Sequence, residues 1–275
     1  MPCRPQSRGR RWRIRVFGNM ERLEIHQFPY GDDNYGVLLH CPHHDQTAVV
    51  DAGDSEATDA ALTARGWSLD QIWITHHHGD HTAGLADLKA RHDATIIGPA
   101  KSAEKFGNFD VKLDDGDHFD FAGRQIDVIA TPGHTLDMLN FHLRSEKLVF
   151  TGDTLFALGC GRLFEGDAAM MWESLEKLLA LSDETVVYCS HEYTAANARF
   201  AVTIDPDNAA LRTRANDVEG MRRRGLETVP TTIELEKATN PFLRADDPAI
   251  RSHLGMKDAT DGAVFAEIRR RKDSF

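Results

Sequence analysis

The sequence contains few cysteines, and none of them lies near another. The four are Cys3, Cys41, Cys160 and Cys189, and no CxxC pair occurs. This wide spacing does not suit the disulfide framework of a small secreted protein, but it does suit a reducing compartment. We therefore expect an intracellular protein of the cytoplasm.

Long apolar runs and an excess of positive charge are also missing. No stretch approaches the ~18–20 apolar residues that a membrane-spanning helix requires. The chain carries 32 Lys and Arg residues against 43 Asp and Glu residues, a formal net charge of −11. Because nucleic-acid binding depends on a basic surface that neutralises phosphates, this balance argues against a nucleic-acid partner. An anionic small substrate would need a local patch of cations.

The first 19 residues differ from this average, with six arginines and no acidic residue. Three interpretations remain open for this basic extension: a targeting leader, a nucleic-acid-binding arm, or sequence upstream of a true start at Met20. It lacks the continuous apolar stretch of a secretory signal.

From Met20 to residue 194, short β-branched runs alternate with turn residues. With 41% hydrophobic and 27% charged residues in a chain of 275, there is enough apolar material for a large core. Helical spacing occurs at 55–65 and 168–181. The predicted strands are LEIHQF, YGVLLH, TAVVDAG, QIWITH, ATIIG, RQIDVIAT, MLNFHL, KLVFTG and TVVYCS. This part is predicted to be a layered α/β domain in which strands are in the majority.

Residues 195–275 lack strand signals and are predicted to form a smaller α-helical domain. One helix is expected over 208–225, closed by a glycine. Thr231 with Glu234 predicts a capping box that opens a second helix, which Asn240 and the following proline end. The stretch 261–272 predicts a third helix.

Metal-binding side-chain types follow several predicted strands. The stretch ITHHHGDHTAGL (74–85) holds four histidines and an aspartate, and other candidates follow three later strands. The candidate metal ligands are His76, His78, Asp80, His81, His134, Asp153 and His191. Polar groups at strand ends lie above a rigid sheet, so we expect these seven to converge on one rim.

Local spacing divides the candidate ligands of residues 74–85 into two groups. Alternation in an extended segment places His76 and His78 on one side and His77 on the other, so the first pair can hold one ion. Asp80 and His81 lie a turn further on and can hold a second. Imidazole and carboxylate donors without thiolate suit Zn²⁺, Mn²⁺ or Fe²⁺, and do not suit a structural cysteine-rich zinc site.

In this combination, HHHGDH with His134, Asp153 and His191 resembles the metallo-β-lactamase superfamily. The resemblance implies an αββα sandwich that carries a metal site on one edge. Asp51, in VVDAGD, matches an early aspartate of that superfamily, which implies a bracing role; a plain turn residue is the alternative.

Four further segments, GDTLFALGCGRLFEG, SHEYTAANARFA, DPDNAALR and RRRKDSF, resemble the hydroxyacylglutathione hydrolase (glyoxalase II) family, and the resemblance runs from Met20 to Phe275. It implies two divalent metal ions, with zinc expected first and iron or manganese as alternatives. The implied ligands are His76, His78 and His134 for the first ion, Asp80, His81 and His191 for the second, and Asp153 as the bridge.

The resemblance also implies an activity. Family members hydrolyse S-D-lactoylglutathione, and related S-(2-hydroxyacyl)glutathiones, to glutathione and D-lactate, the second step of methylglyoxal detoxification. A hydroxide held between the metals would be the nucleophile, with Asp80 and Asp153 as the catalytic carboxylates. A thiolate leaves readily, so the absence of an obvious Ser/His/Asp triad or a dedicated general acid is no objection.

Six residues are implied to bind the glutathione thioester: Arg162, Phe164, Tyr193, Asn197, Arg269 and Lys272. Arg269 and Lys272 are three residues apart and face the same way on the last predicted helix. Phe164 replaces a family tyrosine, and Gly79 stands where a larger residue is common. The expected partner is thus a small molecule, with no nucleic acid or membrane, and the expected assembly is a monomer.

Three other functions remain open. A glutathione persulfide dioxygenase of the superfamily uses a single iron held by two histidines and an aspartate, so the full second ligand set argues against it. A lactonase has no need of Arg269 and Lys272. A nucleic-acid-processing member is supported only by residues 1–19.

Overall fold

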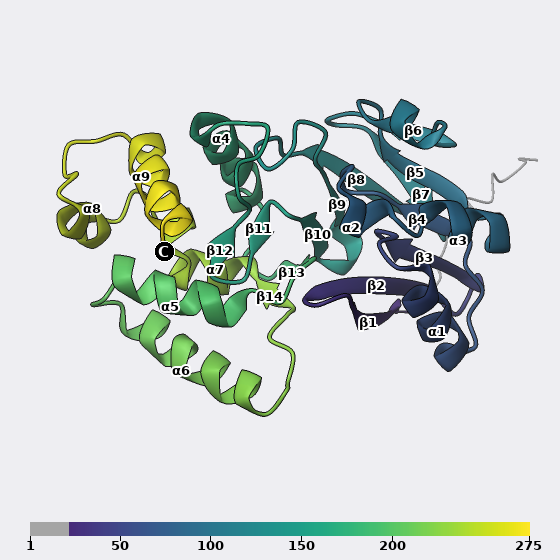
Figure 1. Cartoon of the computed structure of the whole chain (residues 1–275), viewed down its shortest axis with the longest axis horizontal. Coiled ribbons are helices and arrows are strands. Elements are labelled where there is room, and N and C mark those ends of the chain that lie inside the picture. The colour runs from purple at the N-terminus through teal and green to yellow at the C-terminus, as the bar shows by residue number, and fades with distance from the viewer. Residues whose placement is uncertain (1–21) are drawn as a thin grey trace, which may run out of the picture.

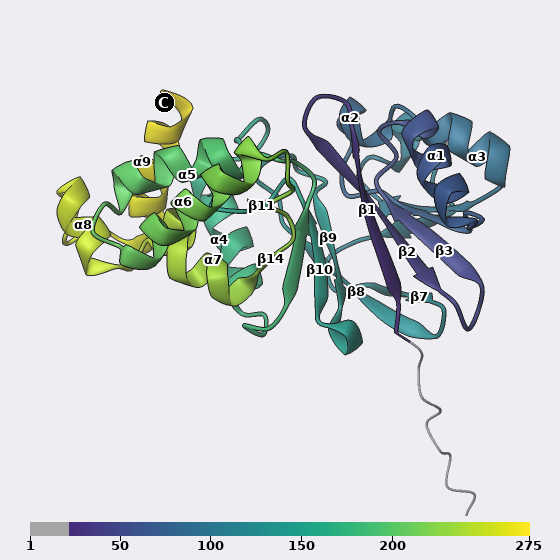
Figure 2. The same cartoon turned by 90° about the horizontal axis from the view of Figure 1, so that it is seen from below.

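The computed structural model describes residues 22–275, so the predictions for the basic extension 1–19 lie outside the described residues. The chain forms two six-stranded sheets with helices outside them (Figures 1 and 2). In spatial order, the first sheet consists of β1 (Glu24–Tyr30), β2 (Asn34–Cys41), β3 (Gln46–Val50), β4 (Gln71–Trp73), β5 (Thr95–Pro99) and β6 (Val111–Leu113). Strands β1 to β3 pair antiparallel, and β3 to β6 pair in parallel.

The second sheet takes its strands from both parts of the chain. Its order is β14 (Thr231–Thr232), β13 (Val186–Cys189), β10 (Leu148–Gly152), β9 (Leu139–Leu143), β8 (Arg124–Ala130) and β7 (His118–Phe121). A short hairpin, β11 (Leu155–Phe156) and β12 (Gly159–Cys160), follows β10. The 3₁₀ turns are η1 (Ala103–Phe106), η2 (Arg144–Glu146) and η3 (Pro241–Leu243).

Helices cover the outer faces of both sheets and form most of the C-terminal region. They are α1 (Ser55–Arg65), α2 (Gly79–Thr82), α3 (Leu85–His92), α4 (Ala168–Leu179), α5 (Thr194–Ile204), α6 (Ala209–Arg223), α7 (Ile233–Thr239), α8 (Pro248–Leu254) and α9 (Asp261–Asp273). In Figure 1, α1 and α3 lie beside the first sheet, while α4 and the C-terminal helices lie beyond the second. No helix of residues 22–275 has the length and apolar character to cross a bilayer.

The alternation of side chains along the strands creates the layers. Leu39 belongs to the core between the two sheets, whereas its neighbour Leu38 belongs to the core under α1 and α3. Trp73 is fully buried between the sheets and meets the rings of Phe119 and Phe121 edge-on, with centroids 5.1 and 5.4 Å away. This packing confirms the predicted αββα sandwich.

The C-terminal helices share a core with the second sheet. Val149 of β10 and Val187 of β13 pack in one apolar cluster with Met171 of α4 and Phe265 of α9. Strand β14 also extends this sheet by pairing antiparallel with β13. The helical domain is therefore joined to the sandwich by a strand and by a common core.

The expected helices at 55–65, 168–181, 208–225 and 261–272 correspond to α1, α4, α6 and α9. The predicted capping box at Thr231 is wrong by one residue. Thr232 is the N-cap of α7 and accepts a hydrogen bond from the backbone N–H of Leu235. Thr231 lies in β14, and its hydroxyl donates instead to buried Glu236. The tertiary partner overrides the local capping signal.

Candidate metal centre and substrate cavity

The seven predicted ligands meet at one edge of the sandwich. His76 and His78 follow β4, Asp80 and His81 lie on α2, and the others follow β8, β10 and β13. The two sheets are tied together at this edge, where the backbone N–H of Tyr35 donates to the carbonyl of Ser190 over 2.7 Å. The strand ends therefore converge as the sequence predicts.

Three imidazoles form the first group. His78 Nδ1 lies 3.1 Å from His76 Nε2 and 3.0 Å from His134 Nε2. The three ligand atoms lie within 4.8 Å of one another, which suits a single small cation. His76 and His78 point to one side, in agreement with the alternation argument.

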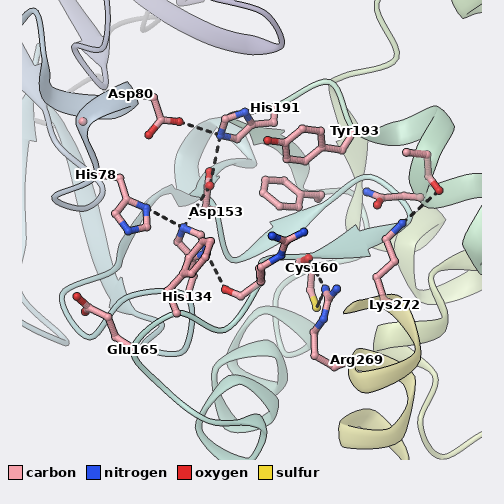
Figure 3. Close-up of a pocket in the computed structure, with 16 residues that line it drawn as sticks. His78, Asp80, His134, Asp153, Cys160, Glu165, His191, Tyr193, Arg269 and Lys272 are labelled. Atoms are coloured by element: carbon pink, nitrogen blue, oxygen red, sulfur yellow. Dashed lines mark hydrogen bonds and ion pairs between the residues drawn. The ribbon is translucent and has the colours of Figure 1, made fainter. Parts of the chain in front are cut away.

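Asp80, His81 and His191 form the second group, also with ligand atoms within 4.8 Å of one another. Asp153 lies between the groups: its Oδ2 is 3.4 Å from His134 Nε2 and 3.3 Å from His191 Nε2. Its Oδ1 is 3.5 Å from His81 Nε2. This is the position that a bridging carboxylate requires (Figure 3).

The far nitrogens of these imidazoles are held by the surrounding protein. Asp51 accepts from His81 Nδ1 over 2.8 Å and from the backbone N–H of Thr75 over 2.8 Å. His134 Nδ1 lies 2.8 Å from the carbonyl oxygen of Arg162. Such contacts fix the ring orientation of metal-ligating histidines. The geometry supports the bracing interpretation of Asp51.

Buried polar atoms test whether this cluster fits metal ions. Among the described residues, His81 Nε2 and Asp153 Oδ1 are buried without a hydrogen-bond partner. Unpartnered buried polar atoms are costly, and here they face the centre of a cluster of nitrogen and oxygen donors. The residues present therefore fit two divalent cations.

The protonation states differ between the two groups. Burial, reinforced by neighbouring imidazoles, lowers the pKa of His76 well below its usual value and also lowers the pKa of His78. The neutral form that binds a metal is thus favoured. Although burial opposes it, the charges of Asp51 and Asp153 raise the pKa of His81 well above its usual value. Cation binding at the second group is therefore linked to release of a proton.

We expect Asp51→Ala to lower metal affinity by about 10–100-fold, the usual effect of losing a group that orients a metal ligand. The substitution leaves His81 Nδ1 and the Thr75 backbone N–H without their acceptor. Metal content after dialysis against a graded chelator series measures the effect. Asp217→Ala, which removes an exposed carboxylate on α6, is the control. If the two variants retained equal amounts of metal, the bracing role of Asp51 would be contradicted.

A cavity of about 800 Å³ extends from the metal ligands to the C-terminal helix. All six residues predicted to bind substrate line it: Arg162, Phe164, Tyr193, Asn197, Arg269 and Lys272. In Figure 3, His78, Asp80 and Glu165 lie at one end, and Arg269 and Lys272 at the other. The structure thus brings the six predicted substrate residues to one cavity with five of the seven predicted metal ligands: His78, Asp80, His134, Asp153 and His191.

The two cations of α9 that line the cavity have different surroundings. Arg269 is 5% exposed, donates to the carbonyl of Cys160 over 3.1 Å and pairs with Asp273 at 2.7 Å. Lys272 is half-buried; its Nζ donates to the carbonyl of Ala196 over 3.3 Å. Burial, with the charge of Arg269 next, lowers the pKa of Lys272 to about 8. Arg269 is therefore held in place by the protein, while Lys272 has fewer partners.

The remaining cavity residues touch the metal ligands or the walls. The ring of Tyr193 stacks on that of His191, with centroids 4.7 Å apart and planes 2° apart. The ring of Phe164 meets His134 edge-on at 5.2 Å and is 61% exposed. The side chain of Asn197 donates to the carbonyl of Ala157 over 3.1 Å and so supports the cavity wall.

Sequence reasoning missed several residues that contact the predicted metal ligands. Asp33 lies 2.9 Å from His191 Nδ1, and Asn34 donates to Asp80 over 3.1 Å. Asp33 lies in the turn before β2 and Asn34 is the first residue of that strand, and only the fold brings the two to residues far along the chain. His77 points away from the ligands, and its two nitrogens lie 2.9 Å from Asp137 and 3.3 Å from Glu165. Asp137 and Glu165 contact opposite nitrogens of the ring, so His77 joins the two loops that carry these carboxylates.

The sandwich and the donor cluster on its edge define a protein of the metallo-β-lactamase superfamily, and the model "Metallo-beta-lactamase superfamily" matches residues 32–191. The model "Hydroxyacylglutathione hydrolase C-terminus" matches residues 192–275. The chain belongs to the hydroxyacylglutathione hydrolase family.

Individual relatives agree with this assignment. Hydroxyacylglutathione hydrolase of Rhizobium meliloti (strain 1021) is 56% identical over 256 residues, which cover 93% of this chain and 100% of that protein. The Brucella anthropi enzyme of the same name is 55% identical, over 92% and 98%. Among solved structures, ETHE1 from Myxococcus xanthus superposes with a TM-score of 0.65 at 26% identity and covers 90% of each chain.

Proposed function

We propose that the protein hydrolyses the thioester S-D-lactoylglutathione, and related S-(2-hydroxyacyl)glutathiones, to glutathione and D-lactate. One observation carries the proposal: one cavity is lined both by five of the clustered metal-binding side chains and by Arg269 and Lys272 of α9. Glutathione carries two carboxylates, and on an acidic protein such cations supply the local attraction that it needs. The names of the relatives agree with this substrate class.

The proposed cofactor is a pair of divalent ions, with zinc expected for imidazole and carboxylate donors. His76, His78 and His134 would hold one ion, Asp80, His81 and His191 the other, and Asp153 both. When bound, such a pair activates water near neutral pH and polarises the thioester carbonyl.

The chain's own residues bind and orient the substrate. Lys272 and Arg269 attract a carboxylate of glutathione at one end of the cavity, while the hydroxyl of Tyr193, which lines the same cavity, donates to the tripeptide backbone. These contacts hold the thioester next to the metal ligands, so that reaction occurs within one bound complex. The sulfur leaves as a thiolate and needs no proton from the protein.

The test is loss of thioester absorbance with S-D-lactoylglutathione, using protein whose metal content has been assayed. Rapid hydrolysis by protein with two metal ions per chain is the expected result. A fully metallated protein that does not hydrolyse this thioester would overturn the proposal. Oxygen consumption with glutathione persulfide and ring opening of a lactone serve as parallel assays for the two other superfamily activities.

We predict that kcat/KM for the glutathione thioester falls as pH rises through about 8, the value to which burial and Arg269 lower the pKa of Lys272. Only the ammonium form attracts the carboxylate, so binding is complete below this pKa and is lost above it. Because kcat/KM reports groups of the free enzyme, it is the quantity to follow. In Lys272→Arg, whose guanidinium stays charged, this fall should be absent; an unchanged profile would exclude Lys272 as its origin.

We also propose that the protein acts as a monomer in the cytoplasm. All the donors and cavity residues come from one chain, so the site is complete without a partner. Cys41, Cys160 and Cys189 are free and buried, as expected in a reducing compartment. Light scattering and cell fractionation test the two parts of this proposal.

A further inference from the structure

Lys272, at the end of the cavity away from the metal ligands, contacts two aromatic rings. Its Nζ lies 5.1 Å from the centroid of the Phe200 ring and 5.4 Å from that of the Phe275 ring. Both distances are within the ~6 Å at which a cation is attracted to the face of an aromatic ring. The two rings also contact each other, with centroids 5.4 Å apart. The ammonium of Lys272 is therefore held by a pair of rings.

The two rings differ in their own surroundings. Phe200 of α5 is 1% exposed and packs against Phe242, with ring centroids 5.9 Å apart, so it belongs to the core. Phe275 follows α9 and is 65% exposed, and its backbone N–H donates to the carbonyl of Lys272 over 3.3 Å. Phe275 does not line the cavity, although Lys272 does. It can therefore act on a bound substrate only through Lys272.

Polar contacts hold Lys272 less firmly than they hold Arg269. Arg269 donates to the carbonyl of Cys160 and pairs with Asp273 at 2.7 Å. Within residues 22–275, Lys272 Nζ donates to the carbonyl of Ala196 over 3.3 Å, which is long for a charged donor. A lysine side chain loses much conformational freedom when it is fixed. The rings supply contacts that hydrogen bonds do not.

The surroundings of Lys272 also disfavour its charge. Burial, followed by the positive charges of Arg269 and Arg199, lowers the pKa of Lys272 to about 8. The face of an aromatic ring acts in the opposite direction, because it carries negative charge density that attracts a cation. Phe200 and Phe275 thus offset part of the cost of keeping an ammonium beside other cations.

We propose that Phe275 is a positioning residue for substrate binding: together with Phe200 it holds the ammonium of Lys272 at the end of the cavity. The carboxylate of glutathione then meets a cation that is already in place, and less freedom is lost on binding. This inference rests on the proposed thioesterase function and deepens it, since it names a residue outside the cavity that sets affinity for glutathione.

The first measurement is kcat and KM for S-D-lactoylglutathione at pH 7, where Lys272 is charged. We expect Phe275→Leu, which keeps an apolar side chain but removes the aromatic face, to raise KM by about three- to tenfold. Its kcat should change by less than about twofold, because lost uniform binding appears in KM. Phe275→Tyr retains an aromatic face and should restore most of the affinity. Leu226→Ala, at an exposed apolar residue outside the cavity, is the control.

A double-mutant cycle tests whether the ring acts through the ammonium. Lys272→Met removes the charge and keeps an unbranched side chain, and it should itself raise KM. Adding Phe275→Leu to Lys272→Met should then raise KM no further, because the contact that the ring makes with the cation is already lost. Calorimetric binding of glutathione to the same four proteins repeats the cycle without catalysis.

Each contrary result has a separate meaning. An unchanged KM in Phe275→Leu, equal losses in Phe275→Leu and Phe275→Tyr, or the same rise in KM when Lys272→Met is present would overturn the inference and leave the thioesterase function intact. Wild-type protein that binds glutathione but hydrolyses no thioester would overturn the proposed function, and the calorimetric cycle would still decide the role of Phe275. Wild-type protein that does not bind glutathione would overturn both.

Discussion

Asp153→Asn is expected to lower thioester hydrolysis by more than about a hundredfold, beyond the loss caused by residues that only support a metal ligand. Asp153 is buried and lies between the two donor groups, 3.3 Å from His191 Nε2 and 3.4 Å from His134 Nε2. An amide keeps the shape of the side chain but removes its charge and one acceptor oxygen. Both groups should therefore bind their ions more weakly.

Steady-state kinetics and metal analysis on the same preparations measure this effect. Asp217→Asn, which replaces an exposed carboxylate on α6, is the matched control and should retain full activity and metal content. If Asp153→Asn kept two ions per chain and normal turnover, the assignment of Asp153 as the bridging ligand would be wrong.

Glu236→Ala is expected to lower the free energy of unfolding by about 3–5 kcal/mol, as for other buried ion pairs that lose one partner. Glu236 is 0% exposed and accepts from Arg214 over 2.5 Å, from the backbone N–H of Leu158 over 2.8 Å and from Asn240 over 3.0 Å. Its removal leaves the guanidinium of Arg214 buried without its counter-charge.

Urea denaturation measures this free energy, with Glu234→Ala on the exposed face of α7 as the control, expected within about 0.5 kcal/mol of wild type. The double variant Arg214→Met/Glu236→Leu replaces both charges by apolar groups and should recover part of the loss. A Glu236→Ala protein as stable as wild type would show that water compensates the lost contacts.

The layers and the position of the site were predictable because local patterns determine both. A continuous apolar run, as in YGVLLH, gives a strand that is buried on both faces, and polar groups such as Asp153 and His191 closely follow their strands. The prediction that His77 points away from His76 and His78 required only the alternation of an extended chain. The cavity residues followed from the family resemblance, since nothing local to Arg162 or Tyr193 indicates a ligand.

The other features depend on contacts between residues distant in sequence. Asp33 and His191 are joined by a contact across 158 residues, and the turn that carries Asp33 has no pattern that points to a metal ligand. The shift of the α7 cap to Thr232 has a similar origin, because Thr231 is engaged by buried Glu236. The pairing of Arg269 with Asp273 is local, at i and i+4, and could have been predicted from the helix alone.

The pairing of β14 with β13, together with the shared core of α9 and the second sheet, has a consequence for substrate affinity. The helix that carries Arg269 and Lys272 is fixed relative to the metal ligands before any substrate arrives. The conformational entropy of ordering the helix that carries this proposed binding surface is therefore lost during folding and not during association. The cavity is preorganised, and substrate recognition does not require two domains to close on each other.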